Sequence, residues 1–129
     1  HDAGHLALSP DNRAWMIVGD LIQRIGTVVI AEPEGDMQRY FESLAWVIQP
    51  APKVIIPSHG QAMASTFRIE QTLKHRKQRE QQILQMHQAG DNVEAMLAQI
   101  YAQVDKRLWG LARLNIQSHL KKLEIEQRL

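Results

Sequence analysis

The sequence contains no cysteine among its 129 residues. This absence excludes disulfide bonds, zinc sites built from thiolates and cysteine nucleophiles. Any metal ion must therefore be held by nitrogen and oxygen ligands. Imidazole and carboxylate side chains are the candidates, and the sequence has six histidines and fourteen acidic residues.

Long apolar runs are also absent. No run approaches the roughly 18 consecutive apolar residues of a membrane helix, and no basic segment followed by an apolar one marks a signal peptide at the start. The apolar content of 44% and the charged content of 22% are typical of a soluble globular protein. We therefore expect a cytoplasmic protein with no membrane partner.

The net charge of +1 conceals two regions of opposite sign. Residues 1–60 contain four basic and seven acidic residues, a balance of −3, whereas residues 61–129 contain eleven basic and seven acidic ones, a balance of +4. A chain of this length can form one ordinary core or two small ones. We expect two domains, residues 1–64 and residues 65–129.

The first region begins with short apolar segments that turn residues separate. Residues 5–8 and 14–18 flank Ser9-Pro10-Asp11-Asn12, and this pattern predicts a β-hairpin. The β-branched residues 27–30 predict a further strand. The loop at residues 32–35 that follows could close over a site.

A helix and a strand are predicted next. Asp36 is a good N-cap, and apolar residues recur after it at helical spacing until Pro50. Residues 53–57 then predict a short buried strand that leads to Ser58-His59-Gly60. Strands with one crossing helix indicate an α/β arrangement for this region.

The second region is predicted to be helical. Residues 65–88 form one long helix whose middle, residues 74–82, has no apolar side chain, and we interpret that part as an ion-paired, solvated face joining the two domains. Gly90 ends this helix, and Asp91-Asn92-Val93-Glu94 resembles a capping box that opens a second one. A third helix is predicted over residues 106–127. Three helices with short joints favour a bundle of the helix-turn-helix type.

Three polar residues stand where short strands give way to loops. They are His1, Asp20 at the end of Met16-Ile17-Val18-Gly19-Asp20, and His59. Strands hold the backbone still while loops let ligands converge, so imidazole, carboxylate and imidazole in this order suit a metal site along one rim of a sheet. A single histidine is more often a surface or capping residue, but the three similar positions weaken that interpretation.

The motifs of this chain also resemble those of a known family. HDAGHLAL, IVGD, TVVIAEPEGDMQRYFESL, VIIPSHG and HRKQREQQIL occur in the order found in the second half of metallo-β-lactamase-fold hydrolases, and the chain is most similar to the subgroup of the β-lactamase-like protein 2 type. The resemblance runs nearly from end to end. It implies an α+β fold in which residues 1–64 are the C-terminal half of an αββα sandwich and residues 65–129 are an all-α, winged-helix-like domain.

The resemblance also implies roles for individual residues. His1 matches a ligand of a first metal ion, Asp20 the aspartate that bridges two ions, and His59 a ligand of the second. Asp20 and His59 are therefore the candidate catalytic residues, and two zinc ions are the implied cofactor, with at most partial occupancy in this chain. Ions about 3.5–4 Å apart can activate a shared water and polarise the scissile group. His5 matches a position near the metals and is less expected to have a direct role.

The family's HxHxDH motif, which supplies the remaining ligands, does not occur in this sequence. We therefore interpret the chain as the C-terminal fragment of a longer hydrolase and expect it to be inactive by itself. Its expected partner is the N-terminal half that carries HxHxDH, and a homo-oligomer is the alternative.

The implied parent cleaves ester, thioester or related acyl bonds of a small-molecule substrate by metal-activated water. A single-strand endoribonuclease of the same fold is the alternative. A non-catalytic interaction module is a third hypothesis, because the third helix has cations and polar side chains that could contact nucleic acid: Arg107, Arg113, Asn115, Gln117, His119, Lys121, Lys122 and Arg128. Glu124 and Glu126 dilute that charge, so nucleic acid is the less favoured partner.

Overall fold

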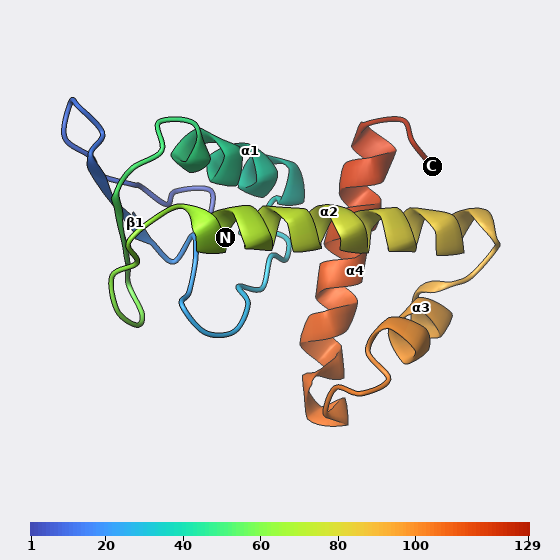
Figure 1. The fold of residues 1–129 in the computed structure, drawn as a ribbon. Helices are drawn as coiled ribbons and strands as arrows, with labels where there is room; N and C mark the ends of the chain where they lie inside the picture. The colour runs from blue at the N-terminus through green and yellow to red at the C-terminus, as the bar shows by residue number, and fades with distance from the viewer.

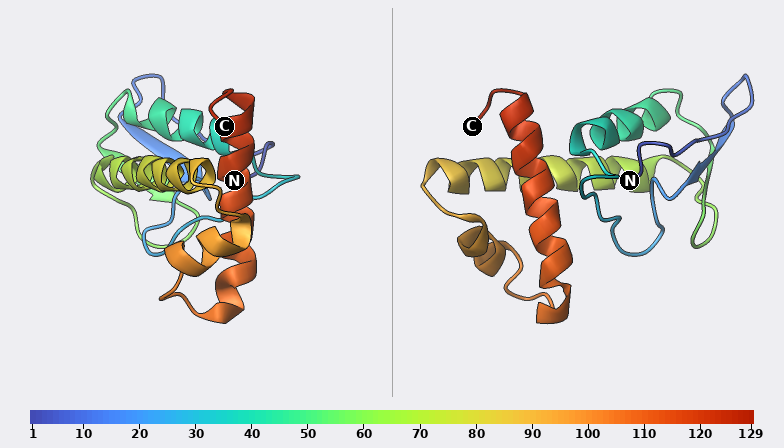
Figure 2. Two further views of the ribbon diagram at one scale, coloured as in Figure 1. Left: turned by 90° about the vertical axis from the view of Figure 1, so that its right-hand side faces the viewer. Right: turned by 180° about the vertical axis from the view of Figure 1, so that it is seen from behind.

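The computed structural model describes residues 1–129 and has an α+β fold. The elements follow the order β1 (Trp15–Gly19), α1 (Met37–Ile48), β2 (Val54–Pro57), α2 (Phe67–Gln88), α3 (Val93–Ile100), the 3-10 helix η1 (Lys106–Leu108) and α4 (Trp109–Ile125). Helix α2 runs along the length of the molecule, with the strands and α1 on one side of α4 and α3 on the other (Figures 1 and 2). None of these helices is both long and apolar enough to cross a lipid bilayer.

The two strands are parallel, and α1 connects them. The strands pair from Trp15 with Val54 to Gly19 with Pro57, with an irregularity between Ile17 and Gly19. Alternate residues of β1 are buried, because successive side chains of a strand point to opposite faces. The predicted α/β arrangement of a buried strand, a crossing helix and a second strand is therefore confirmed for this region.

Local sequence signals set the ends of α1. The Asp36 carboxylate accepts a hydrogen bond from the Arg39 amide at 3.0 Å, which satisfies one of the free donors of the first turn. The helix ends two residues before Pro50, which cannot continue it. Its apolar side faces the first core, where the buried residues are Met37, Tyr40, Phe41, Leu44 and Val47.

The predicted hairpin is present in reduced form. Only Leu8 of its first arm pairs with β1, through two hydrogen bonds to Ile17 of 2.9 and 2.8 Å. Residues 5–7 form no strand.

The prediction of a strand over residues 27–30 is wrong. Side chains of α2 and α4 bind the backbone of this segment in place of a neighbouring strand. The Arg76 guanidinium donates to the Val28 carbonyl, Asn115 Oδ1 accepts from the Ile30 amide at 3.4 Å, and Ser118 Oγ donates to the Ile30 carbonyl at 2.7 Å. Buried backbone groups need partners, and these three side chains supply them without a sheet.

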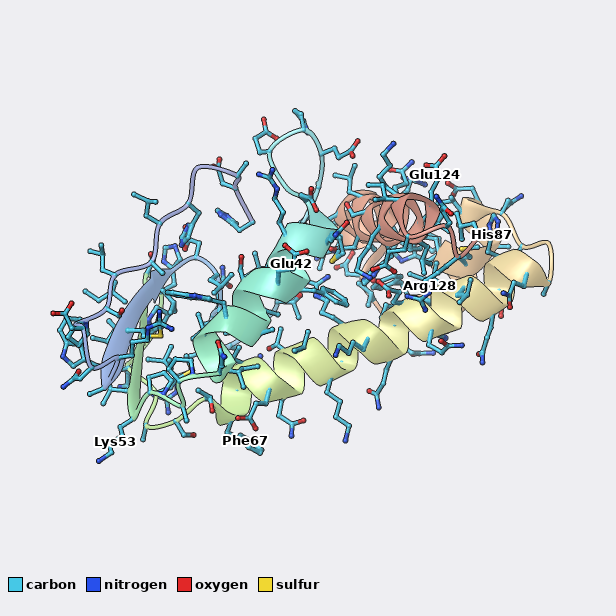
Figure 3. The ribbon with its side chains drawn as sticks, turned by 90° about the horizontal axis from the view of Figure 1, so that it is seen from above. Glu42, Lys53, Phe67, His87, Glu124 and Arg128 are labelled. Atoms are coloured by element: carbon cyan, nitrogen blue, oxygen red, sulfur yellow. The ribbon has the colours of Figure 1, made fainter.

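The predicted long helix is confirmed as α2, and most of its middle is exposed as predicted, but one side of it is buried. Arg76 and Glu80 are only 6% and 4% exposed, because α4 crosses α2 at this level. Figure 3, which looks along α4, shows Arg128 beside this crossing. Buried charges must be paired, and both residues make hydrogen bonds to groups of other elements.

The helices of the second region begin and end near the predicted residues. Gly90, with a φ of 90°, ends the turn after α2, and Asn92 caps α3 by accepting from the Ala95 amide at 2.9 Å. The predicted third helix is divided into η1 and α4.

Helix α2 contributes to two separate hydrophobic cores. Ile69, near its start, packs in the core formed with β1, α1 and β2. Ile83 and Leu84, near its end, pack in a second core with α3 and α4. A boundary between residues 64 and 65 stays a prediction, since α2 lies in both cores.

Candidate functional site

The carboxyl ends of β1 and β2 lie at the same edge of the sheet because the strands are parallel. Asp20 directly follows β1, and His59 is the second residue after β2. The Ser58 amide donates to the Gly19 carbonyl at 2.9 Å and joins the two strand ends. Ligands of α/β proteins commonly bind at this edge of a sheet.

Asp20 and His59 meet at this edge. His59 Nε2 lies 3.3 Å from Asp20 Oδ1, with the Asp20 side chain 33% exposed and the imidazole 71% exposed. Asp20 Oδ1 is itself buried and makes no hydrogen bond. Two of the three metal-ligating residues predicted from the sequence are thus neighbours in space.

The chemistry of this pair fits a metal ion. A buried carboxylate oxygen without a hydrogen bond has an unfavourable environment, and a cation can satisfy it. An imidazole nitrogen on the same side is the second donor that zinc prefers. The exposed edge of the His59 ring leaves room for ligands from outside the pair.

His1 lies with His5 and makes no contact with the pair. The two imidazole rings pack edge to face, with centroids 5.8 Å apart and planes at 81°. The hydrogen bond from the Ala3 amide to the Glu34 carbonyl, 2.9 Å long, ties the His1 segment to the loop before α1. No group of three or more imidazoles and carboxylates in the structure could hold a metal ion. The three-ligand set is therefore not assembled here, and His1 stays a predicted ligand.

A shallow cleft of about 490 Å³ borders His59. Its lining residues include Arg24, whose guanidinium donates to the Gln61 side chain. Gly60 has a φ of 94°, and a Cβ there would lie 3.1 Å from Arg24 Cβ. This position therefore brings Arg24 close to the loop that carries His59. A larger hollow of about 530 Å³ includes His1 and His5 but neither Asp20 nor His59.

The polar face predicted on the third helix for nucleic acid is partly buried. Asn115, His119 and Lys122 are buried, and their hydrogen bonds are to groups within the protein. Arg113 pairs with Glu94 at 2.7 Å. The other predicted residues, Arg107, Gln117, Lys121 and Arg128, are exposed, so part of the predicted face is available to a partner.

Two comparisons with known proteins bear on this arrangement. Residues 93–129, which include α3, η1 and α4, match the family model of the beta-lactamase associated winged helix domain. The whole chain is 34% identical, over 134 aligned residues, to "Beta-lactamase-like protein 2 homolog" of Drosophila melanogaster. This confirms the resemblance to the β-lactamase-like protein 2 type. The chain spans 44% of the length of that relative.

Sequence reasoning did not identify the residues that support the site. The buried polar residues Arg76, Asn115 and Ser118 fix the segment between Asp20 and α1, and they are far from it in sequence. His5 donates to the backbone of β1, whereas the resemblance placed it only near the metals. Gly19 before Asp20 was the one local signal for a close approach at this point.

Proposed function

We propose that the chain is part of a metal-dependent hydrolase of the metallo-β-lactamase superfamily, in which Asp20 and His59 bind zinc. The observation that carries the proposal is the buried, unpaired Asp20 oxygen 3.3 Å from His59 Nε2 at the carboxyl ends of two parallel strands. His1 is the third proposed ligand, and in this structure it packs against His5. The other proposed ligands belong to the region that corresponds to the part of the longer relative that this chain does not span.

Bound zinc would polarise the carbonyl or phosphoryl group of the substrate and lower the pKa of a bound water. The residues of this chain contribute position and charge. The strand ends fix Asp20 and His59 relative to each other, and the Asp20 carboxylate and the His59 imidazole would hold the metal. The domains proposed for this arrangement are residues 1–64, which carry the ligands, and residues 65–129, which are the helical, winged-helix-like part.

Calorimetric titration of the chain with Zn²⁺ tests the ligand assignment. Asp20→Asn and His59→Ala should each weaken zinc binding by about tenfold or more, because each removes one donor of a small ligand set. His87→Ala is the matched control, since His87 is an exposed imidazole on α2 away from the strand edge. Equal affinity of the wild type and both site variants would refute the assignment.

The first candidate substrates are esters, thioesters and related acyl compounds, which fit water activated by two metal ions. The second candidate is a phosphodiester of single-stranded RNA, and the cleft beside His59 favours it. The cleft wall contains a guanidinium and two side-chain amides, Arg24, Gln23 and Gln61. Arginine binds phosphate oxygens better than it binds neutral acyl groups.

The two candidates separate in a paired assay of the full-length protein. Thiol release from acyl thioesters and cleavage of an RNA oligomer are each measured with and without a chelator. Arg24→Met should reduce RNA cleavage more than thioester hydrolysis, since it removes the cation and keeps most of the side-chain length. A chelator-insensitive activity would exclude the metal mechanism, and the 129-residue chain alone should show negligible turnover of either substrate.

The outer face of the sheet supports a further partner. Trp15, Ile17 and Val54 lie on this face and are 41%, 38% and 37% exposed, and Leu8 beside them is 60% exposed. We propose that the remainder of the longer protein covers this face, with self-association as the alternative. Sedimentation of the isolated chain as a monomer, with no binding of a hydrophobic dye, would contradict this.

A further inference from the structure

We infer that His5 is a positioning residue that holds the turn between β1 and Asp20 in the geometry the metal site requires. The inference rests on the proposed function, because it treats Asp20 as a ligand. His5 itself is not a ligand through Nε2, since that nitrogen lies 2.9 Å from the Val18 carbonyl oxygen. A carbonyl only accepts, so Nε2 carries the proton.

The Val18 carbonyl is the anchor of this turn. It accepts from His5 Nε2 and also from the Leu21 amide at 3.1 Å, so both of its acceptor positions are in use. Asp20 lies within the turn that these two donors close. Loss of the imidazole donor would leave the turn with only its own backbone hydrogen bond.

Gly19 shows how closely the ring approaches the backbone. The φ of Gly19 is 54°, and a Cβ built on it would lie 2.3 Å from His5 Cε1 and 2.6 Å from His5 Nε2. The imidazole therefore fills the space that any other side chain at position 19 would need. His5 and glycine at position 19 form a matched pair immediately before Asp20.

The same ring contacts His1 and is linked to His59 only through the backbone of Gly19 and Ser58. It packs edge to face on His1 at 5.8 Å. The Gly19 carbonyl, next to the ring, accepts from the Ser58 amide at 2.9 Å, and Ser58 precedes His59. A shift of Gly19 would therefore move Asp20 and His59 relative to each other, and His5 is the side chain that opposes this shift.

Three replacements of His5 separate its donor from its bulk. His5→Gln keeps an N–H donor, His5→Phe keeps a ring over Gly19 without a donor, and His5→Ala removes both. In metal-free protein, the Leu21 and Ser58 amides should exchange with solvent about tenfold faster in the Phe and Ala variants, the effect of one lost hydrogen bond. The Gln variant should restore most of the protection, and the Ile116 amide of the second core should be unchanged in all three.

Zn²⁺ titration followed through the Asp20 amide resonance is the second measurement. The Phe and Ala variants should bind Zn²⁺ about tenfold more weakly than the wild type, and the Gln variant should lie close to it. A merely structural role would change melting temperature and leave the affinity of the folded protein unaltered. If the wild type binds no Zn²⁺, the proposed function fails in this chain, while amide exchange still decides whether His5 positions the turn.

A double-mutant comparison tests the matched pair directly. Gly19→Ala should lower the melting temperature much more in the presence of His5 than in the His5→Ala background, where the steric overlap is gone. The positive φ affects both backgrounds alike. Equal losses in the two backgrounds, or unchanged Leu21 and Ser58 exchange in His5→Phe, would overturn the inference.

Discussion

Replacement of Glu80 by glutamine should lower the free energy of unfolding by about 3 kcal/mol near neutral pH. Glu80 lies on α2 against Lys122 of α4 and is 4% exposed. Its Oε1 accepts from Lys122 Nζ and Arg128 Nη1, each at 3.0 Å, and its Oε2 lies 3.3 Å from His119 Nδ1. One buried carboxylate therefore joins α2, α4 and the C-terminal segment.

The magnitude follows from the pKa of Glu80. Burial alone would raise this pKa, but hydrogen bonds from His119 and Lys122, with the charge of Lys122, outweigh burial and lower the pKa from 4.5 to about 2. The difference corresponds to about 3 kcal/mol, because each pKa unit is worth about 1.4 kcal/mol. Glutamine keeps the size of the side chain and removes the charge.

His119 helps to fix the charge state of this cluster. The ring is fully buried, and burial lowers its pKa below the ordinary value of 6.5. Its Nε2 has no hydrogen-bond partner, so the proton belongs on Nδ1, where it is donated to Glu80. The histidine is neutral in the folded protein, and its charging in acid would oppose folding.

The cluster also gives the stability a defined pH dependence. A carboxylate whose folded pKa is depressed stabilises the protein fully above its unfolded pKa of about 4.5 and loses that contribution as the pH falls through about 2. The low folded pKa of His119 acts in the same direction, beginning below its ordinary value of 6.5. The wild type should therefore lose stability in acid more steeply than Glu80→Gln.

Urea unfolding, followed by circular dichroism across this pH range, measures both effects. Glu94→Gln is the matched control, because Glu94 pairs with Arg113 at 2.7 Å on the exposed surface. Removal of the Glu94 charge should change the free energy of unfolding little, since exposed ion pairs contribute little to stability. A loss below about 1 kcal/mol for Glu80→Gln, or equal acid sensitivity in the two proteins, would refute the reasoning.

Two further substitutions test other parts of the fold. Gly35→Ala should destabilise the protein by about 1–3 kcal/mol in urea unfolding, because the added Cβ would meet the Ala31 backbone at 2.7 Å and the His1 carbonyl at 2.9 Å. Gly110→Ala should instead stabilise it by about 0.5–1 kcal/mol, because the space around the added Cβ in α4 is open. A Gly35→Ala protein more stable than Gly110→Ala would contradict both assignments. Asn115→Ala should lower the free energy of unfolding by about 1–3 kcal/mol and speed hydrogen exchange of the Ile30 amide, because Asn115 Oδ1 accepts from that amide and from Arg76. Unchanged exchange of the Ile30 amide would show that Asn115 does not hold residues 27–30.

The parts of the fold that the sequence predicts correctly depend on neighbouring residues. Asp36 and Asn92 cap helices within three residues of themselves, and Gly90 ends a turn through its own φ. The meeting of Asp20 with His59 also follows from a simple rule, because parallel strands place their carboxyl ends at one edge.

The parts that the sequence does not predict depend on distant partners. Residues 27–30 have the composition of a strand, but Arg76, Asn115 and Ser118 bind their backbone from 48 or more positions away on other elements. The charged middle of α2 predicts a solvated surface, and no local signal shows that its Arg76 and Glu80 are buried against α4. The position of His1 relative to Asp20 depends on how the segment before β1 is held, and no local pattern specifies this.

An anomalous difference map from crystals of the chain equilibrated with Zn²⁺ tests the central claim most directly. The account predicts a peak at the strand edge, about 2.0–2.2 Å from an Asp20 carboxylate oxygen and from His59 Nε2. Zinc bound only at other histidines, with Asp20 and His59 still in contact and without metal, would contradict it.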